Sequence, residues 1–504
     1  MIVDDQQDIR AFLADGAPFE AAEPVTLIET HISLIALAGD SAFKLKRAVK
    51  LPYLDFSTPD LRLAACEAEV ALNSLTAPGL YRGVHRITRD AAGHLTLGGK
   101  GRLVDALIEM ARFDQDLLFD RMASAGRLTP ALMTETARMI ARVHRTAPVS
   151  ADAGGARRIG DVLSINESGF ATSSVFSADE VERLSARFRA ELSRHAGLLD
   201  RRAAAGKVRR CHGDLHLRNI CLLDGKPRLF DCIEFNAELA TTDVLYDLAF
   251  LLMDLWHRGF ADLANLTMNR YLDDAEEDDG FVLLPLLMAI RAAVRAHVTA
   301  TQVAESWGPS EALVREARSY FSLADALLGG EPPRLVAIGG LSGSGKTTVA
   351  DRLAPRLGAP PGARLLESDR IRKSLFDVPA ETRLPQAAYA PDVSQEVYRE
   401  LALRAGVLLS AGACVVADAV FDKPEHRARM AEAAHAAPAR FTGIWLQADA
   451  ATLHRRVRDR APGPSDATVD VLARQLDRLP QVADWRHLRA DDPVDAIVEA
   501  ALKG

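Results

Sequence analysis

The sequence predicts two fold classes in one chain: an α+β region of two lobes in residues 1–328, followed by an α/β region with a parallel sheet in residues 334–504. Three observations lead to this division. Mixed strand and helix patterns come first, a Gly-Gly-Glu-Pro-Pro stretch interrupts the chain at residues 329–333, and alternating strands and helices follow it. The two glycines free the backbone and the two prolines prevent a helix from continuing, so this stretch is the expected linker.

The first region begins with strand-like runs and then becomes helical. The strand-like runs are residues 26–28, 33–38 and 42–45. An amphipathic pattern over Asp60–Leu75 predicts a helix. The pattern beyond it is mostly helical, apart from a loop-and-strand stretch over Cys211–Phe235. We therefore expect a small lobe in residues 1–115 and a larger, helical lobe in residues 116–328.

The second region alternates short β-rich runs with amphipathic segments. The expected strands are Leu335–Ile338, Ala413–Ala417 and Phe441–Leu446, and the expected helices include Thr348–Leu357. Strands that alternate with helices favour a parallel sheet, because parallel neighbours need a crossover connection.

Composition excludes several classes of protein. A chain of 504 residues is too long for one hydrophobic core, and its 48% hydrophobic and 26% charged residues are typical of globular domains. The net charge is −8 and no half is strongly basic, so we expect no nucleic-acid binding. Five cysteines favour a reducing, cytoplasmic location. The acidic N-terminus and the lack of a long apolar run predict neither a signal peptide nor a membrane span, and the oligomeric state stays open.

One polar segment of the first region has the spacing of a phosphoryl-transfer site. Residues 211–219 read CHGDLHLRN. Asn219 follows Asp214 by five residues, and Asp231 follows it by seventeen, after a strand-like run. Transfer from ATP needs one carboxylate that orients the acceptor hydroxyl, and an amide oxygen and a second carboxylate that hold Mg²⁺. These three side chains can supply both functions.

This segment resembles the H-G-D-x-H-x-x-N catalytic loop of the aminoglycoside phosphotransferase and choline kinase family, and also the H-R-D loop of protein kinases. Gly213 and His216 favour the small-molecule kinases. The resemblance implies that Asp214 is the catalytic aspartate and that Asn219 and Asp231 are metal ligands. It also implies a two-lobed, protein-kinase-like fold for the first region.

Cysteine and histidine are also concentrated here, which raises the alternative of a zinc site. The residues are Cys211, His212, His216 and Cys221. Their spacing fits no structural zinc pattern, and the chain has no second element with paired cysteines. We therefore expect no zinc, and we expect His212 to brace the loop.

A kinase small lobe also needs a strand lysine that contacts the phosphates and a helical glutamate that holds it. Lys44 and Lys46 fall on the same face of one strand-like run. Lys44 is favoured, because Ala42 then occupies the place of the small residue in kinases, but Lys46 remains open. Of the two candidate glutamates, Glu67 and Glu69, the second borders the apolar face of its helix and is preferred.

The second region opens with a complete phosphate-binding loop, G-x-x-x-x-G-K-[ST], between a predicted strand and a predicted helix. Backbone N–H groups of such a loop face the phosphates, and the helix N-terminus adds positive potential. Lys346 should bridge the β- and γ-phosphates, and Thr347 should bind Mg²⁺. The expected ATP-binding residues are Gly340, Ser342, Gly343, Ser344, Gly345, Lys346, Thr347 and Thr348.

A carboxylate and an arginine after the next strand indicate an acceptor site. Asp369 ends a strand-like run and Arg372 follows three residues later. This resembles the acceptor site of P-loop small-molecule and polynucleotide kinases. The resemblance implies that Asp369 takes the proton of the acceptor and that Arg372 holds an anionic group.

Three further charged residues complete the expected site. Asp418 closes an apolar strand and takes the place of the carboxylate near Mg²⁺. Arg456 and Arg460 lie one turn apart in an expected helix over Leu453–Arg460. This segment resembles the arginine-bearing lid of gluconate-kinase-like and chloramphenicol-phosphotransferase-like enzymes, whose arginines offset charge on the transferred phosphoryl group.

Residues 25–328 and 334–500 together resemble bacterial proteins described as bifunctional aminoglycoside phosphotransferase/ATP-binding proteins. The resemblance implies a tandem phosphotransferase that uses ATP and Mg²⁺ and acts on small hydroxylated acceptors. Two alternatives stay open: one active kinase with the other module as an ATP-sensing regulator, or a regulatory ATP-binding protein with little phosphotransfer. The sequence identifies neither acceptor and implies no role in antibiotic resistance.

Overall fold

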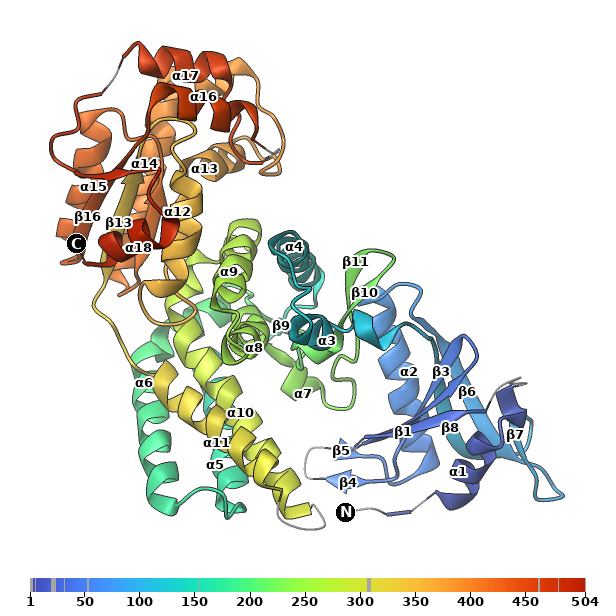
Figure 1. Cartoon of the computed structure of the whole chain (residues 1–504). Helices are drawn as coiled ribbons and strands as arrows, with labels where there is room; N and C mark the ends of the chain where they lie inside the picture. The colour runs from blue at the N-terminus through green and yellow to red at the C-terminus, as the bar shows by residue number, and fades with distance from the viewer. Residues whose placement is uncertain are drawn as a thin grey trace. The chain divides into compact units, whose positions relative to one another are not determined.

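The structure is a computed structural model that describes residues 3–4, 6–19, 24–30, 32–51, 54–152, 154–305, 310–460, 463–478 and 480–503. The chain forms two compact units, which we describe separately (Figure 1). Unit 1 consists of Met1–Arg158 and Leu199–Leu251, and unit 2 consists of Ile159–Leu198 and Leu252–Gly504. The units therefore do not divide at the linker, since Leu252–Leu328 and the whole second region belong to unit 2.

Unit 1 contains a six-stranded antiparallel sheet in the order β1-β2-β3-β8-β6-β7. Its strands are β1 (Thr26–Glu29), β2 (Ser33–Ala38), β3 (Ser41–Lys46), β6 (Tyr81–Arg89), β7 (Leu95–Leu97) and β8 (Arg102–Ala111). Side chains alternate across the sheet, and a helix covers each face. Ile9 of α1 (Gln7–Ala14) belongs to the same buried cluster as Phe43 and Leu45. Cys66 of α2 (Pro59–Thr76) belongs to a second cluster on the other face.

Helix α2 agrees with the helix predicted over Asp60–Leu75. Thr58 caps its N-terminus by accepting the N–H of Leu61, and a proline occupies the first turn, where no hydrogen-bond donor is needed. Two antiparallel pairs, β9 with β12 and β10 with β11, flank the segment 211–219. The remaining elements of unit 1 are β4 (Lys50–Leu51), β5 (Leu54–Asp55), α3 (Phe119–Ser124), α4 (Pro130–Thr146), β9 (Val208–Arg210), β10 (Ile220–Leu223), β11 (Lys226–Leu229), α7 (Ala237–Ala240) and β12 (Thr241–Asp243).

Helices dominate the first part of unit 2. Three of them, α5 (Gly155–Ala171), α6 (Ala178–Ala204) and α8 (Val244–His257), extend into both units, and α9 (Ala261–Ala275), α10 (Leu284–Glu305) and α11 (Glu311–Leu327) lie wholly in unit 2. Among the described residues, one stretch, Asp278–Val303, is long and apolar enough to span a membrane; an 18-residue window within it has a mean hydropathy of 1.7. Of that window, 72% is buried within the protein, as in a core helix.

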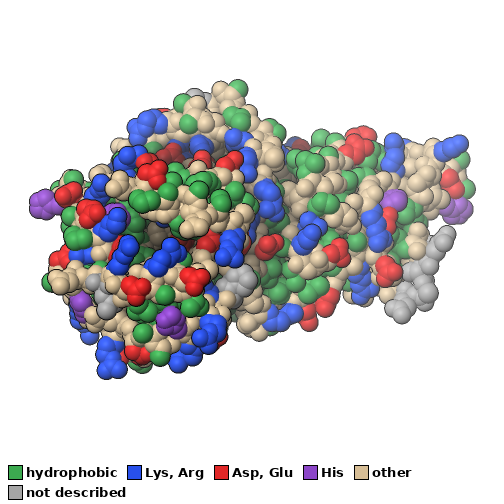
Figure 2. All heavy atoms as spheres, turned by 90° about the horizontal axis from the view of Figure 1, so that it is seen from above, with side chains coloured by type: hydrophobic (Ala, Val, Ile, Leu, Met, Phe, Trp, Pro, Cys, Tyr) green, Lys and Arg blue, Asp and Glu red, His purple; other side chains and the backbone are tan. Residues whose placement is uncertain are grey.

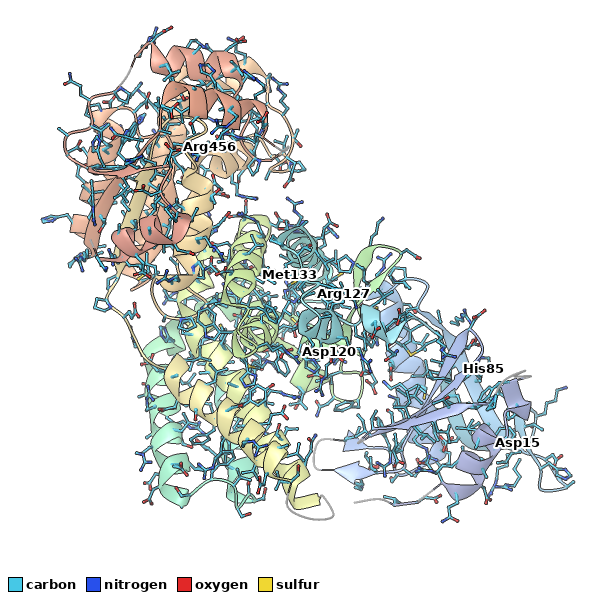
Figure 3. All side chains as sticks on the ribbon, viewed as in Figure 1. Asp15, His85, Asp120, Arg127, Met133 and Arg456 are labelled. Carbon is cyan, nitrogen blue, oxygen red and sulfur yellow. The ribbon has the colours of Figure 1, made fainter. Side chains whose placement is uncertain are left out.

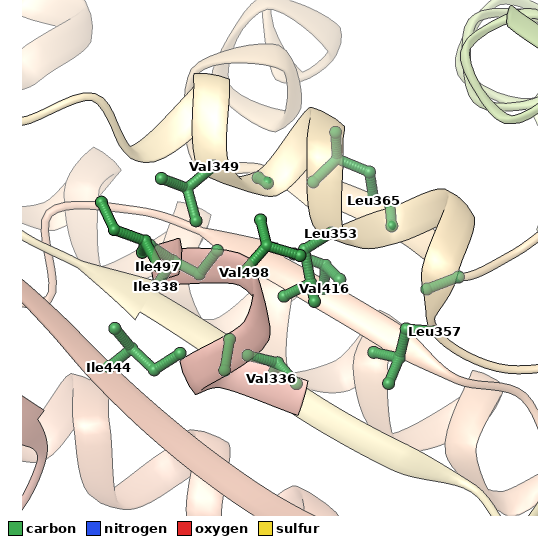
Figure 4. Packing of buried hydrophobic residues seen from close by; sticks show 14 of the residues in the cluster. Val336, Ile338, Val349, Leu353, Leu357, Leu365, Val416, Ile444, Ile497 and Val498 are labelled. Atoms are coloured by element: carbon green, nitrogen blue, oxygen red, sulfur yellow. The ribbon is translucent and has the colours of Figure 1, made fainter. Parts of the chain in front are cut away.

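The second region forms a five-stranded parallel sheet in the order β14-β15-β13-β16-β17, as its alternating pattern predicts. The strands are β13 (Arg334–Gly339), β14 (Arg364–Glu367), β15 (Val415–Asp418), β16 (Arg440–Gln447) and β17 (Arg486–Arg489). On one face, α12 (Lys346–Leu353) and α18 (Val494–Lys503) pack through Val349 and Ile497 on Val336 and Val416 (Figure 4). On the other side, α14 (Pro391–Ser410) and α15 (Pro424–Ala436) contact the strands.

The remaining helices of this sheet domain are α13 (Ser368–Leu375), α16 (Ala450–Arg458) and α17 (Val469–Leu476). Two helix predictions were wrong at their ends. The helix expected over Thr348–Leu357 begins at Lys346 and ends at Leu353, because Pro355 follows. The helix expected to include Arg460 ends at Arg458, so Arg456 and Arg460 are not successive turns of one helix. Basic and acidic side chains are interspersed on the face in Figure 2.

Candidate active sites

The catalytic loop predicted in the first region is held by a buried carboxylate. Asp247 of α8 accepts the N–H of His212 at 3.3 Å and the N–H of Gly213 at 2.8 Å, and Nε2 of His144 lies 3.0 Å from the same carboxylate. Gly213 has φ 84°, a left-handed conformation that favours glycine, and an added Cβ would lie 3.0 Å from Ile233. Asp247 therefore holds the backbone of the two residues that precede Asp214.

Asp214 and Asn219 contact one another directly. Nδ2 of Asn219 donates to the backbone oxygen of Asp214 at 2.9 Å and to its Oδ2 at 3.0 Å. Nε2 of His216 lies 3.3 Å from the same Oδ2. The Asp214 side chain is 40% exposed, so an acceptor can reach it. Because both bonds use the amide nitrogen of Asn219, only its Oδ1 can serve as a metal ligand.

Asp231 joins this loop to the small lobe. It has φ 61°, which is unusual for a residue with a side chain, and its N–H donates to the hydroxyl of Tyr81 at 3.1 Å. Its Oδ1 lies 2.5 Å from Nζ of Lys44, and the same Nζ lies 2.8 Å from Oε1 of Glu69. The structure thus brings together the lysine, the helical glutamate and the second aspartate that the sequence predicts.

Lys46 contacts the other oxygen of the same glutamate. Its Nζ lies 2.6 Å from Oε2 of Glu69 and also pairs with Glu234. Burial alone would raise the pKa of Glu69, but Lys44 and Lys46 overcome it and hold that pKa at about 2. Lys44 is 12% exposed and reaches Asp231, whereas Lys46 is 2% exposed and lies among buried carboxylates. The geometry therefore favours Lys44 as the phosphate-side lysine.

Within the described part of the chain, the cysteines of this region are buried and form no disulfide bond. Among the described residues, one buried group of metal-binding types is His144, Cys211 and Asp247, whose nearest ligand atoms lie within 4.8 Å of one another. Two of these side chains already brace the catalytic loop, so this group has a structural explanation. Neither His216 nor Cys221 belongs to it.

The phosphate-binding loop of the second region connects β13 to α12. Gly343 and Gly345 have φ of 86° and 87°, and both need glycine for that reason. An added Cβ at Gly343 would lie 2.8 Å from the backbone oxygen of Leu453 on α16. At Gly345 it would lie 4.0 Å from Nη1 of Arg456. The loop therefore packs closely on the helix that carries one predicted lid arginine.

Lys346, Thr347 and Asp418 form the centre of this second site. Oγ1 of Thr347 donates to Oδ2 of Asp418 at 2.6 Å, and Nζ of Lys346 donates to the backbone oxygen of Leu341 at 3.3 Å. Burial raises the pKa of Asp418 to about 7; the charge of Lys346 opposes this shift, and Glu367 and Asp369 add to it. Burial lowers the pKa of Lys346, against the charges of Asp418 and Asp369.

Asp369 lies at the start of α13, directly after β14, and is half-buried. Burial raises its pKa, and a hydrogen bond from Ser465 and the charge of Lys346 act in the opposite direction. Nη1 of Arg372 donates to the backbone oxygen of Ala388 at 2.7 Å, and its guanidinium lies 4.7 Å from the ring of Tyr389. Nε of Arg372 is buried and has no hydrogen-bond partner among the described residues.

The two predicted lid arginines differ in their contacts and exposure. Nη2 of Arg456 donates to the backbone oxygen of Ala490 at 3.2 Å and lies 3.3 Å from Oδ1 of Asp491 (Figure 3). Arg460 is exposed, and its charge acts on Lys346. Part of the predicted lid, residues 461–462, lies outside the described residues.

Several contacts at the two sites have no sequence motif that would have revealed them. Tyr81 and Glu234 complete the first site, and Gln475 of α17 accepts the N–H of Ser342 at 2.9 Å at the second. One further residue near the second site, Glu367, could have been predicted from strand register. Glu367 ends β14 opposite Asp418, and two parallel strands that end in acidic residues place them side by side.

Two family models match the chain. The phosphotransferase enzyme family matches residues 113–281, and an AAA domain model matches residues 335–482. Uncharacterized proteins of Mycobacterium tuberculosis and Mycobacterium bovis are 30% identical over 483 residues, which cover 94% of this chain and 93% of theirs. The chain belongs to the same family as these proteins.

This chain thus combines a phosphotransferase-family domain with a P-loop domain. Over the P-loop region, a shikimate kinase of Nitrobacter winogradskyi is 31% identical over 184 residues, 34% of this chain and 75% of that enzyme. Among solved structures, a choline/ethanolamine kinase family protein from Mesorhizobium loti is 16% identical, with 64% of this chain and 94% of that protein covered and a TM-score of 0.40. A gluconokinase from Sinorhizobium meliloti is 21% identical, with 34% and 90% covered and a TM-score of 0.25.

The predicted fold class is confirmed. The chain contains a kinase-like α+β domain of the phosphotransferase family, followed by an α/β P-loop kinase domain with a five-stranded parallel sheet. Below, the first module is residues 1–328 and the P-loop module is residues 334–504; these boundaries remain predictions. Kinase domains of both types imply the use of ATP.

Proposed function

We propose that the chain is a tandem phosphotransferase that uses Mg²⁺ and ATP, in which each module transfers the γ-phosphoryl group to a hydroxyl of a small acceptor. One observation carries the proposal. Each module, by itself, assembles a lysine for the phosphates, oxygen ligands suited to a metal ion and a carboxylate for the acceptor. These are the parts that phosphoryl transfer requires, because its catalysis is mainly positioning and charge stabilisation.

In the first module, the proposed roles follow from the contacts. Lys44 contacts the phosphates while Glu69 fixes its ammonium group, and Asp214 orients the acceptor hydroxyl and receives its proton. Oδ1 of Asn219 and the carboxylate of Asp231 are hard oxygen donors, which fit Mg²⁺ and not a soft metal. Mg²⁺, when bound, neutralises charge on the triphosphate.

In the P-loop module, the loop N–H groups and Lys346 bind the phosphates, and Thr347 and Asp418 are the oxygen donors that fit Mg²⁺. Asp369 receives the proton of the acceptor, and burial, which raises the pKa of its carboxyl group, makes the carboxylate a stronger base. Arg456 and Arg460 stabilise charge on the transferred phosphoryl group.

We propose that the acceptor of the P-loop module carries an anionic group as well as a hydroxyl. The buried Nε of Arg372 has no partner in the described structure, and this arginine lies near enough to Asp369 for their charges to interact. A buried donor without a partner has a cost that an anionic ligand would remove. The shikimate kinase relative is consistent with this class, since its named substrate is a hydroxylated carboxylate.

The test is a mass-spectrometric search for phosphorylated products in a metabolite extract incubated with ATP, Mg²⁺ and the full chain. Asp214→Asn and Lys346→Ala, made separately, should each remove a different product and leave the other. Asp369→Asn should lose the same product as Lys346→Ala and keep ATP affinity. Matched controls are Asp224→Asn, in an exposed turn with φ 51°, and Lys503→Ala, exposed on α18.

The outcomes separate the alternatives. If one substitution removes every product, one module is the kinase and the other acts as a regulator. If ATP binds but neither substitution changes any product, the chain is an ATP-binding regulatory protein and the proposal is wrong.

A further inference from the structure

Helix α9 covers the open edge of the parallel sheet. Strand β14 is the outermost strand, so one side of its backbone has no neighbouring strand. Nδ2 of Asn265 donates to the backbone oxygens of Pro361 and Ala363 at 2.9 and 3.0 Å, and Oδ1 of Asn269 accepts the N–H of Leu365 at 2.8 Å. Two asparagine side chains of α9 therefore replace the missing strand.

Buried ion pairs fix the beginning of β14 against the same helix. Arg364 has no exposed side-chain surface; its Nη2 lies 2.6 Å from Asp273 of α9, and its Nε lies 2.7 Å from Asp278. Arg404 of α14 also pairs with Asp278, at 2.5 Å. Removing one partner from such a group leaves an uncompensated buried charge. The contact between α9 and β14 is therefore an integral part of the folded unit 2.

Arg270 of α9 reaches the other end of β14, beside the candidate site. Its Nη1 donates to Oε2 of Glu367 at 3.0 Å, and its Nη2 lies 3.9 Å from Oδ1 of Asp351 on α12. Arg270 is 6% exposed and Glu367 is 5% exposed. Glu367 is in register with Asp418 and stands two residues before Asp369. One guanidinium therefore contacts both elements that carry the site.

A second arginine, Arg370, also contacts Glu367, from its own side of the site. Arg370 lies on α13, next to Asp369, and its Nε lies 3.7 Å from Oδ2 of Asp273 on α9, which is beyond hydrogen-bond distance. Arg270 belongs to a different helix, which the two asparagines and Asp273 hold against β14. Of these two arginines, Arg270 is the one that itself belongs to α9 and also reaches α12, through Asp351.

We infer that Arg270 is a positioning residue for the P-loop module, which holds the end of β14 and the start of α12 at a fixed spacing so that Asp369 and Asp418 keep their places. The inference rests on the proposed function. Arg270 lies within residues 113–281, the range that matches the phosphotransferase enzyme family. One module thus supplies support to the site of the other.

The test uses the full chain with Asp214→Asn, which leaves the P-loop module as the source of turnover, and MgATP as the probe. The activity is the ATP turnover that Lys346→Ala removes. Arg270→Met should lower kcat about tenfold or more and change KM for ATP less than about threefold, because Arg270 does not contact the phosphate-binding loop. Arg270→Lys keeps the charge and should recover most of kcat.

Hydrogen exchange gives a second readout that does not need turnover. In Arg270→Met, amide exchange over residues 366–371 should rise about tenfold, while residues 361–365, which the asparagines hold, should stay protected. The matched control is Arg352→Ala, whose exposed ion pair with Asp262 also joins α12 to α9. Exposed pairs contribute little, so this control should match the parent in both measurements.

The outcomes are distinct. If Arg270→Met has the same kcat and the same amide exchange as Arg352→Ala, the inference is wrong. It is also wrong if Arg270→Met only lowers the melting temperature and leaves kcat and local exchange unchanged. If the parent has no turnover that depends on Lys346, the proposed function of this module fails, and exchange over residues 366–371 still decides the inference.

Discussion

The two candidate sites are built in opposite ways. The first joins residues far apart in the sequence: Lys44 and Asp231, whose side chains lie 2.5 Å apart, are separated by 187 positions. The second is largely local, since residues 340–347 form a continuous loop and Asp418 closes the adjacent strand. A local loop is recognisable from sequence spacing, whereas a site assembled by tertiary contacts needs the fold.

The lysines of the two sites also differ in what surrounds them. Lys44 and Lys46 share one buried carboxylate and each has a second acidic partner. Lys346 instead contacts a backbone oxygen at 3.3 Å, and burial lowers its pKa. The first site therefore has charges that stabilise the fold as well as the charge that we propose binds ATP. Lys346 of the second site forms no ion pair among the described residues.

The largest expected effect tests the proposed base of the first site. Asp214→Asn should lower phosphorylation by the first module about 10²- to 10⁴-fold and leave ATP affinity nearly unchanged, because the amide cannot accept the proton. Product formation and ATP binding are measured in the Lys346→Ala background, with Asp224→Asn as the control. Asn219→Ala and Asp231→Asn should instead raise the Mg²⁺ concentration required. Wild-type turnover in Asp214→Asn would show that another group is the base.

The second prediction separates the two lysines of the small lobe. Lys44→Met should lower kcat/KM for ATP about 10²- to 10³-fold, since it removes a cation from the phosphates. Lys46→Met should instead lower the free energy of unfolding by about 3–5 kcal/mol, because Glu69 and Glu234 lose their buried counter-charge.

Urea unfolding and ATP turnover of the same two variants make the comparison. Adding Glu234→Gln to Lys46→Met should recover part of the stability, as it removes one buried negative charge. If Lys46→Met is stable and inactive while Lys44→Met is active, the two roles are exchanged.

The third prediction concerns pH and the second site. Asp418 has a pKa of about 7, so its carboxyl group is protonated below that pH and must lose a proton before it can bind Mg²⁺. The Mg²⁺ concentration for half-maximal turnover should therefore rise about tenfold per pH unit below 7 and level off above it. Glu367→Gln should move this transition to lower pH, because Glu367 raises the pKa of Asp418. A Mg²⁺ requirement that is constant between pH 6 and 8 would contradict the prediction.

The smallest effect is expected at the linker. Limited proteolysis should cut within residues 329–333, which have no regular secondary structure. The sequence alone predicts two separately folded units, but Arg364 and Asp273 join residues on both sides of this cut. We therefore expect the fragments to elute together in size-exclusion chromatography, with little change in turnover. If the two fragments separate and each stays folded, the chain divides into two independent units at the linker, as the sequence alone predicts.

The sequence alone predicts the fold class, but it predicts the strand order of neither sheet. The roles of the candidate site residues that it names remain predictions. Glu69, which the sequence favours because it borders the apolar face of its helix, is buried against both lysines. The roles of Glu234 and Arg270 could not be predicted, because their contacts join residues about 100 or more positions apart and follow no spacing rule. The helix end at Arg458 was missed because the basic pattern continues past it, although Pro462 in the sequence is a signal that a helix stops nearby.

The asparagines of α9 have a consequence for how this chain can be divided. A chain that began at residue 334 would carry β14 with the oxygen of Ala363 and the N–H of Leu365 unmatched, and Arg364 without its two carboxylates. Uncovered strand edges pair readily with other chains and start aggregates. Helix α9 therefore protects the P-loop module from self-association. An N-terminally truncated chain keeps this protection only if it still includes α9.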